Sequence, residues 1–334
     1  MQAIVYRRPG MVGVEEREVG APGPGQALVR VRACGVCGTD RHIYHGEFPA
    51  TPGAVLGHEY AGEVVAVGEG VTDLQPGMRV AVDPNIVCGR CRPCRAGKVH
   101  LCENLTALGV NYDGGFAEYS LAPRNQLYRF GEALDWAEAA MAEPLACCLH
   151  GGDLAGVQPG MSVLVIGGGA IGLLHVQLAR LSGAARVTVS DPLPARRDLA
   201  LRLGADAALD PRGLSAEQMR MALDGGADVV IEAVGSPATA ALSVQAAAAG
   251  GTVIWFGVAA PAAQATLSPY DVYRREITVR GSFVNPFTHR RAVALLESGR
   301  VQVTPLISRR VPLTDVPAVL AAPAGDDIKT VAVF

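Results

Sequence analysis

A glycine-rich turn constrains the fold of this chain more than any other feature. It lies in the run SVLVIGGGAIG, where Gly167, Gly169 and Gly172 follow a short apolar segment in the pattern G-x-G-x-x-G. A helix-compatible stretch, LLHVQLARLSG, comes next. In this strand–turn–helix context the pattern is typical of a dinucleotide-binding unit, because the glycines permit a tight turn and let a pyrophosphate approach the backbone. Ala170 and Ile171 begin the predicted helix, whose N-terminal amides and dipole favour that anion.

An acidic residue after the next apolar run predicts which dinucleotide binds. The run RVTVSD ends at Asp191, nineteen positions after Gly172. This is close to the spacing of roughly 20 residues at which a carboxylate binds the adenosine ribose hydroxyls and disfavours the 2′-phosphate of NADP. NAD is therefore the expected cofactor. Arg196 follows closely enough to accept such a phosphate, but we expect it to pack on the adenosine.

Three further apolar runs complete the predicted nucleotide domain. ADVVIEAVG, GGTVIWFGV and ITVRGSF end in small residues and alternate with alanine-rich helical stretches. Together with the first two runs they predict a doubly wound parallel sheet of the α/β class over residues 148–283. The run GGTVIWFGV is expected to form a sheet edge that could pair with a second copy. Ligands bind outside the carboxyl ends of such strands, which adds the expected cofactor neighbours Val234, Gly235, Phe256, Gly257 and Ser282.

The chain before this domain predicts a β-rich fold with a metal site. Short runs such as QAIVYR, ALVRVRACG and GMRVAVDP alternate in polarity and are separated by glycine and proline, which favours a small barrel. Cys37, His58 and Glu59 lie in a segment whose glycines and prolines predict turns and short strands. Thiolate, imidazole and carboxylate groups are ligands of catalytic zinc sites. A buried thiol and a hydrogen-bonded core histidine would account for the same residues without a metal.

Four cysteines form a second candidate metal site. Cys88, Cys91, Cys94 and Cys102 follow the spacing C-x2-C-x2-C-x7-C. Four thiolates on short loops can converge on one ion in a closed tetrahedral site. An iron–sulfur cluster or a zinc module that reads nucleic acid could use similar spacing, although the x3-C-P ending of the bacterial cluster motif is absent. We expect a structural zinc that holds this lobe in shape.

Composition narrows the function classes. A length of 334 residues suggests two domains. The 29 basic and 32 acidic residues give a net charge of −3, so no general positive field would attract nucleic acid or an anionic membrane. The start, MQAIVYRRPG, lacks the apolar core of a signal peptide, and no apolar run reaches the roughly 18–20 residues needed to span a bilayer. A soluble cytoplasmic protein is expected.

The ordered motifs resemble one enzyme family. GVCGTDxH, GHEYAGEVVAVG, the cysteine spacing, EPL and the glycine fingerprint are together similar to zinc-dependent medium-chain alcohol and polyol dehydrogenases, in the branch of sorbitol, arabinitol and threonine dehydrogenases. The resemblance covers nearly the whole chain. It implies a GroES-like catalytic domain over 1–147 and 284–334 and a Rossmann NAD-binding domain over 148–283. It further implies one catalytic zinc, one structural zinc, and a dimer or tetramer.

The resemblance also implies roles at the catalytic zinc. Cys37, His58 and Glu59 would surround the ion. Glu143, in the otherwise apolar segment EPLACCLHGG, would be a fourth ligand or would bond to the zinc-bound water. Without a metal, Glu143 would be interpreted as an exposed helix-cap glutamate, because burying a carboxylate costs free energy unless it contacts a cation. Asp40 would orient His58.

The implied reaction moves a hydride from a polyol or secondary alcohol to NAD and leaves a ketone or ketose. Thr39 would pass on the substrate proton, His42 would relay it toward solvent, and Cys147 would approach the nicotinamide. Val284 and Asn285 stand where sorbitol dehydrogenases carry an Arg-Tyr pair, so a shorter polyol, a vicinal diol or another secondary alcohol is expected rather than sorbitol. A threonine dehydrogenase and a catalytically silent relative are the alternatives.

Overall fold

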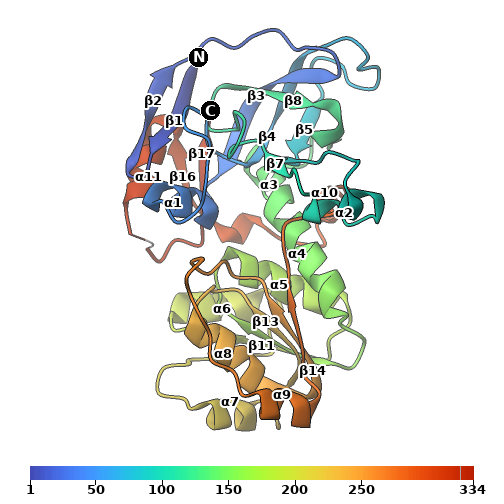
Figure 1. The fold of residues 1–334 in the computed structure, drawn as a ribbon, viewed down its shortest axis with the longest axis vertical. Coiled ribbons are helices and arrows are strands. Elements are labelled where there is room, and N and C mark those ends of the chain that lie inside the picture. Colours follow the sequence, from blue (N-terminus) through green and yellow to red (C-terminus); the bar gives the residue numbers. More distant parts are fainter. Residues whose placement is uncertain (324) are drawn as a thin grey trace. The chain divides into compact units, whose positions relative to one another are not determined.

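The chain folds into two compact units, and the computed structural model describes every residue except 324 (Figure 1). The first unit comprises Met1–Ala146 and Asn285–Phe334, and the second comprises Cys147–Val284. The second unit is thus one residue longer at each end than the predicted domain 148–283. The sequence shows no break at the first boundary between the units, because the boundary between Ala146 and Cys147 lies inside a continuous helix.

The second unit contains a six-stranded sheet in the order β12-β11-β10-β13-β14-β15. Every neighbouring pair in it runs parallel, which confirms the predicted α/β class. Its strands are β10 (Ser162–Ile166), β11 (Arg186–Ser190), β12 (Ala207–Leu209), β13 (Ala227–Glu232), β14 (Ala247–Trp255) and β15 (Thr278–Gly281).

The predicted edge strand is wrong. β14, which contains most of the run GGTVIWFGV, lies between β13 and β15, and β15 forms the edge. Val253 and Ile254 of β14 are fully buried, whereas Thr278 and Arg280 of β15 are exposed. An apolar run of this kind belongs inside a parallel sheet with both faces covered.

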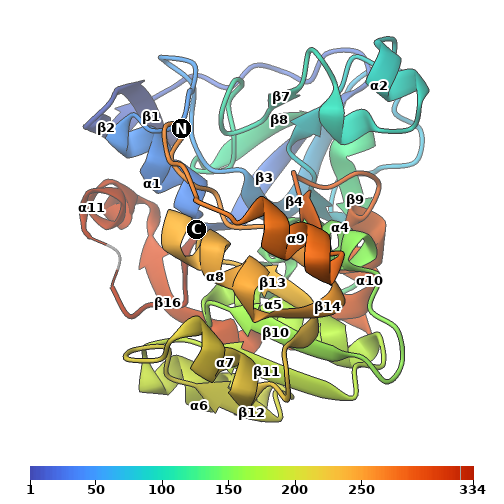
Figure 2. The same ribbon diagram turned by 60° about the horizontal axis from the view of Figure 1, so that its bottom comes forward.

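Helices cover the sheet of the second unit. α6 packs against β11 and β12, and α8 packs against β13 and β14 (Figure 2). Leu164, Val230 and Val253 from the strands form one buried core with Met219 of α7 and Val244 of α8. The helices are α4 (Ala142–Ala155), which begins in the first unit, α5 (Ala170–Leu181), α6 (Pro194–Arg202), α7 (Ala216–Ala222), α8 (Pro237–Ala246) and α9 (Pro269–Arg275).

The first unit is built on a seven-stranded sheet in the order β16-β17-β3-β4-β5-β9, with β8 also paired to β3. β17 pairs antiparallel with β3, so the C-terminal segment returns to this unit as predicted. Two small sheets, β1-β2 and β6-β7, accompany the large one. The strands are β1 (Gln2–Arg8), β2 (Met11–Glu16), β3 (Gln26–Gly35), β4 (Glu59–Val67), β5 (Arg79–Val82), β6 (Asn85–Ile86), β7 (Thr106–Ala107), β8 (Tyr119–Pro123), β9 (Leu127–Arg129), β16 (Ile307–Pro312) and β17 (Lys329–Val333).

A helix occupies part of the segment predicted to be turns and short strands. α1 (Gly38–His45) begins after Cys37, whose backbone amide donates to the Asp40 carboxylate at 2.9 Å, and ends at Gly46 in the left-handed conformation. Such terminal residues favour a helix even among glycines. The other helices of this unit are α2 (Arg92–Arg95), α3 (Trp136–Ala140), α10 (His289–Glu297) and α11 (Val316–Ala321), with short 3-10 turns at Val99–Leu101, Arg124–Gln126, Thr304–Leu306 and Leu313–Asp315.

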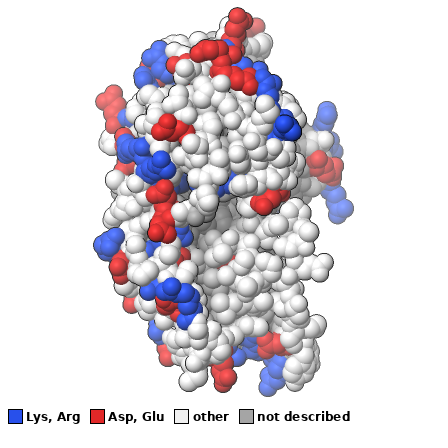
Figure 3. All heavy atoms as spheres, turned by 90° about the vertical axis from the view of Figure 1, so that its left-hand side faces the viewer, with Lys and Arg blue, Asp and Glu red and all other residues white. Residues whose placement is uncertain are grey.

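The surface carries charges of both signs. On the face drawn in Figure 3, Lys and Arg lie among Asp and Glu without a continuous basic area. The mixed charge on this face agrees with the net charge of −3. Within the described part of the chain, none of the helices combines the length and apolar character that a membrane crossing requires.

Asp83 of the first unit predicts a pH-dependent stability. Its buried carboxylate accepts the backbone and side-chain amides of Asn85, both at 3.0 Å, and burial raises its pKa from 3.8 to about 6. The folded state therefore holds this proton more tightly than the unfolded state, and the resulting stability is complete below the unfolded pKa and lost as the pH rises through 6. Between about pH 4 and pH 7, the wild type should lose about 2 kcal/mol of unfolding free energy relative to Asp83→Asn.

Urea denaturation of both proteins across this pH range measures the difference. The exposed Asp73 serves as a control, because Arg124 lowers its pKa and it should not titrate in this window. Parallel stability profiles for the wild type and Asp83→Asn would contradict the expectation.

Candidate active site

Three predicted metal ligands lie together in the first unit. The ligand atoms of Cys37, His58 and Glu59, here called the Cys37 cluster, all lie within 4.8 Å of one another. The antiparallel pairing of Gly35 in β3 with Glu59 in β4 brings the two parts of the segment together. His58 and Glu59 are buried, whereas Cys37 is partly exposed. A mixed set of three ligands with one exposed side suits a catalytic zinc, which keeps a position open for substrate.

Asp40 lies behind His58. One oxygen of its fully buried carboxylate is 3.4 Å from Nδ1 of His58, and the other accepts the amide of Cys37. Burial opposes protonation of His58, but Asp40 and Cys37 outweigh it and raise the pKa of the imidazole well above its ordinary range. A carboxylate facing Nδ1 leaves Nε2 available to a metal. The predicted orienting role of Asp40 agrees with this geometry.

Lys329 is a buried member of the site that sequence reasoning missed. Its Nζ forms an ion pair with Oε2 of Glu59, and both side chains are almost fully buried. Burial favours the neutral amine, but Glu59 and the nearby Cys37 raise the pKa of Lys329 above its ordinary value. A Cβ added to Gly35 would lie 2.2 Å from Oε2 of Glu59, so only glycine leaves room for this pair. A lysine inside the apolar run IKTVAVF was the available signal.

Glu143 is buried in the first turn of α4, which rules out the exposed helix-cap interpretation. Among the described residues, it is not part of the group whose ligand atoms lie within 4.8 Å of one another. Its role as a fourth ligand stays a prediction.

The predicted proton path begins on α1. Thr39 is partly buried in the first turn of the helix, and His42 lies three residues later, so the two side chains share one face. Nδ1 of His42 is 2.6 Å from Oε2 of Glu47. A carboxylate on Nδ1 favours the tautomer in which Nε2 accepts a proton. Glu47 was not predicted, and it follows Gly46 in the turn that ends the helix.

The four predicted cysteine ligands also converge. The sulfurs of Cys88, Cys91, Cys94 and Cys102 lie within 4.8 Å of one another. The sulfur of Cys102 accepts the backbone amides of Cys88 and Asn104, each at 3.3 Å. Backbone amides lower the pKa of Cys88 to about 6, which favours its thiolate. All of these cysteines are free, and four converging sulfurs suit a closed structural zinc site.

The glycine fingerprint of the second unit has the shape of a phosphate cradle. A Cβ added to Gly172 would lie 1.8 Å from the carbonyl oxygen of Gly167, and one added to Gly167 would meet Val234 at 2.8 Å. A Cβ on Gly169, the residue before α5, would meet no atom within 4 Å. Close turn packing together with open space before a helix N-terminus fits a pyrophosphate. Ala170 opens α5, and Ile171 and Gly172 follow it in the first turn.

Asp191 is fixed beside this cradle. It follows β11 directly, is buried, and accepts the amides of Gly168 at 2.7 Å and Leu193 at 2.8 Å through its two oxygens. Nη1 of Arg196 is 3.8 Å from the same carboxylate. The structure thus places the predicted acid and arginine together at the carboxyl end of the sheet.

The remaining predicted cofactor neighbours follow three other strands at the same end. Parallel register places Ile166 opposite Glu232, Glu232 opposite Trp255, and Trp255 opposite Gly281. The segments after β13, β14 and β15 therefore all begin at the carboxyl end of the sheet. They contain Val234, Gly235, Phe256, Gly257 and Ser282. Cys147 is partly exposed in α4, and its approach to the nicotinamide stays a prediction.

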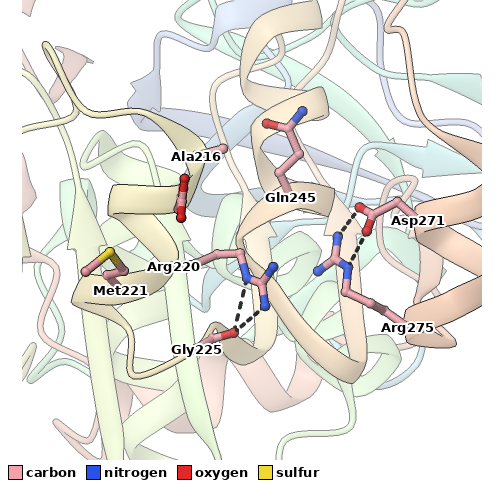
Figure 4. Close-up of a pocket in the computed structure, with 8 residues that line it drawn as sticks. Ala216, Arg220, Met221, Gly225, Gln245, Asp271 and Arg275 are labelled. Carbon is pink, nitrogen blue, oxygen red and sulfur yellow. Dashed lines mark hydrogen bonds and ion pairs between the residues drawn. The ribbon is translucent and has the colours of Figure 1, made fainter.

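A pocket of about 520 Å³ elsewhere in the second unit contains none of the predicted residues. Its two guanidinium groups already have partners: Arg220 donates to the carbonyl of Gly225 at 3.2 and 3.1 Å, and Arg275 pairs with Asp271 (Figure 4). We assign no ligand to it.

Comparison with known proteins agrees with the two units. Residues 23–132 match the alcohol dehydrogenase GroES-like domain, and residues 170–298 match the zinc-binding dehydrogenase domain. Together with the fold and the Cys37 cluster, these matches define an oxidoreductase with a zinc-binding and a nucleotide-binding part. The chain belongs to the zinc-dependent medium-chain alcohol and polyol dehydrogenase family.

Individual relatives cover nearly the whole chain. D-altritol 5-dehydrogenase of Agrobacterium fabrum is 38% identical over 94% of each chain. L-threonine 3-dehydrogenase of Pyrococcus horikoshii is 35% identical over 93% of this chain and 91% of its own. The crystal structure of a putative zinc-binding dehydrogenase from Sinorhizobium meliloti 1021, bound to NADP, has a TM-score of 0.97 and 45% identity over 100% of this chain and 99% of that chain. The nucleotide of that relative leaves the prediction of NAD open.

Proposed function

We propose that this enzyme oxidises a polyol or another secondary alcohol by transferring a hydride to NAD, which leaves a ketone or ketose. The observation that carries the proposal is the Cys37 cluster, supported by Asp40 and Lys329, in a chain that also contains the glycine cradle. The similarity to D-altritol 5-dehydrogenase favours a polyol.

Cys37, His58 and Glu59 would hold the catalytic zinc, and Glu143 would complete the ligand set directly or through water. A zinc ion there would act as a Lewis acid that acidifies an alcohol hydroxyl. Asp40 would orient the ring of His58, and Lys329 would compensate the charge of Glu59, so the ligands would be held in place before substrate arrives.

The protein's own groups would move the proton. The hydroxyl of Thr39 can accept the proton from the substrate and donate its own toward His42. Because Nδ1 of His42 lies against the carboxylate of Glu47, Nε2 would be the nitrogen that accepts the proton, and the partly exposed ring would release it to solvent. NAD, when bound, supplies the hydride acceptor.

Cys88, Cys91, Cys94 and Cys102 would hold a second zinc that shapes their lobe without taking part in the chemistry. Their mutual distances and the amides on Cys102 support this role. Metal analysis of the purified protein should therefore find about two zinc ions per chain. A zinc content near one ion per chain would show that only one of the two proposed sites binds zinc.

The fixed carboxylate of Asp191 supports NAD over NADP. A 2′-phosphate placed near it would meet a like charge, and repulsion of the wrong ligand gives specificity. We expect the wild type to prefer NAD, and Asp191→Ser to lower the ratio of kcat/KM for NAD to that for NADP by about tenfold or more, or ~1.4 kcal/mol. The exposed Asp198 of α6 provides the control, since Asp198→Ser should leave the ratio unchanged. A wild type that prefers NADP would overturn this assignment.

Substrate specificity is tested with a panel. Purified enzyme with NAD should form NADH with at least one polyol, vicinal diol or secondary alcohol. L-Threonine belongs in the panel because of the relative from Pyrococcus horikoshii. Turnover of threonine alone would favour the threonine dehydrogenase alternative, and no turnover by zinc-loaded protein would favour a silent relative.

We also propose a homo-oligomer, a dimer or tetramer, on the basis of the family resemblance. β15 is an exposed sheet edge, and such an edge can pair with another chain. Light scattering after size-exclusion chromatography tests this, and a monomer would contradict it.

A further inference from the structure

A buried glutamate organises the carboxyl end of the nucleotide sheet. Glu232 is the last residue of β13 and is 1% exposed. Its Oε1 accepts the backbone amides of Val234 at 2.8 Å and Gly235 at 2.9 Å and the hydroxyl of Thr239 at 2.8 Å. Three donors on one oxygen compensate the burial of a carboxylate and fix its position.

The backbone of the same residue holds a second loop. The carbonyl oxygen of Glu232 accepts the amides of Phe256 and Gly257, both at 2.9 Å. The side chain thus holds the loop after β13 while the main chain holds the loop after β14. These two loops carry four of the five cofactor neighbours predicted from strand ends.

The two loops fit together without spare room. A Cβ on Gly257 would lie 2.1 Å from the amide nitrogen of Gly235, which itself has a φ of +83°. Gly167 of the glycine fingerprint contacts the same loop, because a Cβ there would lie 2.8 Å from the side chain of Val234. A shift of the loop that Glu232 holds would therefore also change the wall of the phosphate cradle.

We propose that Glu232 is a positioning residue for the nucleotide cofactor: its carboxylate fixes the loop after β13 in the shape that receives the dinucleotide. The inference rests on the proposed function, since it requires a nucleotide site at the carboxyl end of this sheet. The side chain acts through Val234, Gly235 and Thr239 and need not touch the ligand itself.

Isothermal titration calorimetry of the purified chain with NAD and with NADH tests the positioning role of Glu232 without requiring turnover. Glu232→Ala removes the acceptor of two partly buried amides and one of the acceptors of the Thr239 hydroxyl, and should raise both dissociation constants about tenfold or more. Glu232→Gln keeps an acceptor oxygen and should raise them less than about threefold. Thr239→Val removes a single donor and gives a milder probe if Glu232→Ala does not fold.

Asp228, at the other end of the same strand, is the matched control. Its carboxylate accepts the amide and the hydroxyl of Ser162, each at 2.7 Å. Asp228→Ala should lower the thermal midpoint without changing either dissociation constant, while zinc content stays equal in all variants. The inference would be overturned if Glu232→Ala and Thr239→Val fold and bind NAD and NADH with the dissociation constants of the wild type. A wild type that binds neither NAD nor NADH would instead overturn the proposed function.

Discussion

Replacing Cys37 by serine should lower kcat/KM by about a thousandfold or more, which corresponds to ~4 kcal/mol of transition-state stabilisation. The thiolate would be the softest zinc ligand of the Cys37 cluster, and a serine hydroxyl binds zinc far more weakly. Zinc content should fall from about two ions per chain to about one, because the four-cysteine site lies elsewhere in the chain. Steady-state kinetics and metal analysis of the same preparation measure both effects.

Cys34 supplies the control for this substitution. It is a fully buried free thiol three residues earlier in the chain and is not part of the Cys37 cluster. Cys34→Ala should cost stability through lost packing while kcat/KM stays within about threefold of the wild type. Equal activity of Cys37→Ser and the wild type would contradict the assignment of Cys37 as a zinc ligand.

Replacing Lys329 by methionine should lower the free energy of unfolding by about 3–5 kcal/mol. The change removes one partner of a buried ion pair and leaves Glu59 uncompensated close to Cys37 and Asp40. Urea denaturation at neutral pH of wild type and variant, each prepared free of zinc, measures the loss without interference from a bound cation.

A double-mutant cycle separates the charge from the packing. In the Lys329→Met background, Glu59→Gln removes the uncompensated charge and should restore part of the lost stability, so the two single effects should not add. Additive losses would show that the ion pair contributes nothing beyond the space its side chains fill.

Features encoded in short segments were predictable from the sequence. The glycine fingerprint and Asp191 belong to one local strand–turn–helix unit, and the structure places both at the carboxyl end of the sheet. The four cysteines lie within fifteen residues of one another, so their convergence needs no knowledge of the rest of the fold. The membership of the chain in its family followed from the order of such local motifs.

Features that depend on distant strands were not predictable in the same way. Strand order is set by packing, and the apolar composition of β14 did not reveal that β15 lies outside it. Lys329 reaches Glu59 because β17 pairs with β3, across most of the length of the chain. Glu232 looked like one more residue of an apolar run, and its three donors come from the turn and helix that follow. The helix α1 was missed because its capping residues stand among glycines.

We propose that alcohol oxidation by this chain is linked to NAD and depends on zinc in the Cys37 cluster. The most direct test measures NADH formation with the best polyol of the panel before chelation, after removal of the catalytic zinc, and after zinc is returned. We expect activity to be lost on removal and restored by zinc, while Cys37→Ser stays about a thousandfold or more less active than the zinc-loaded wild type. Undiminished NADH formation by protein shown to lack zinc would contradict it.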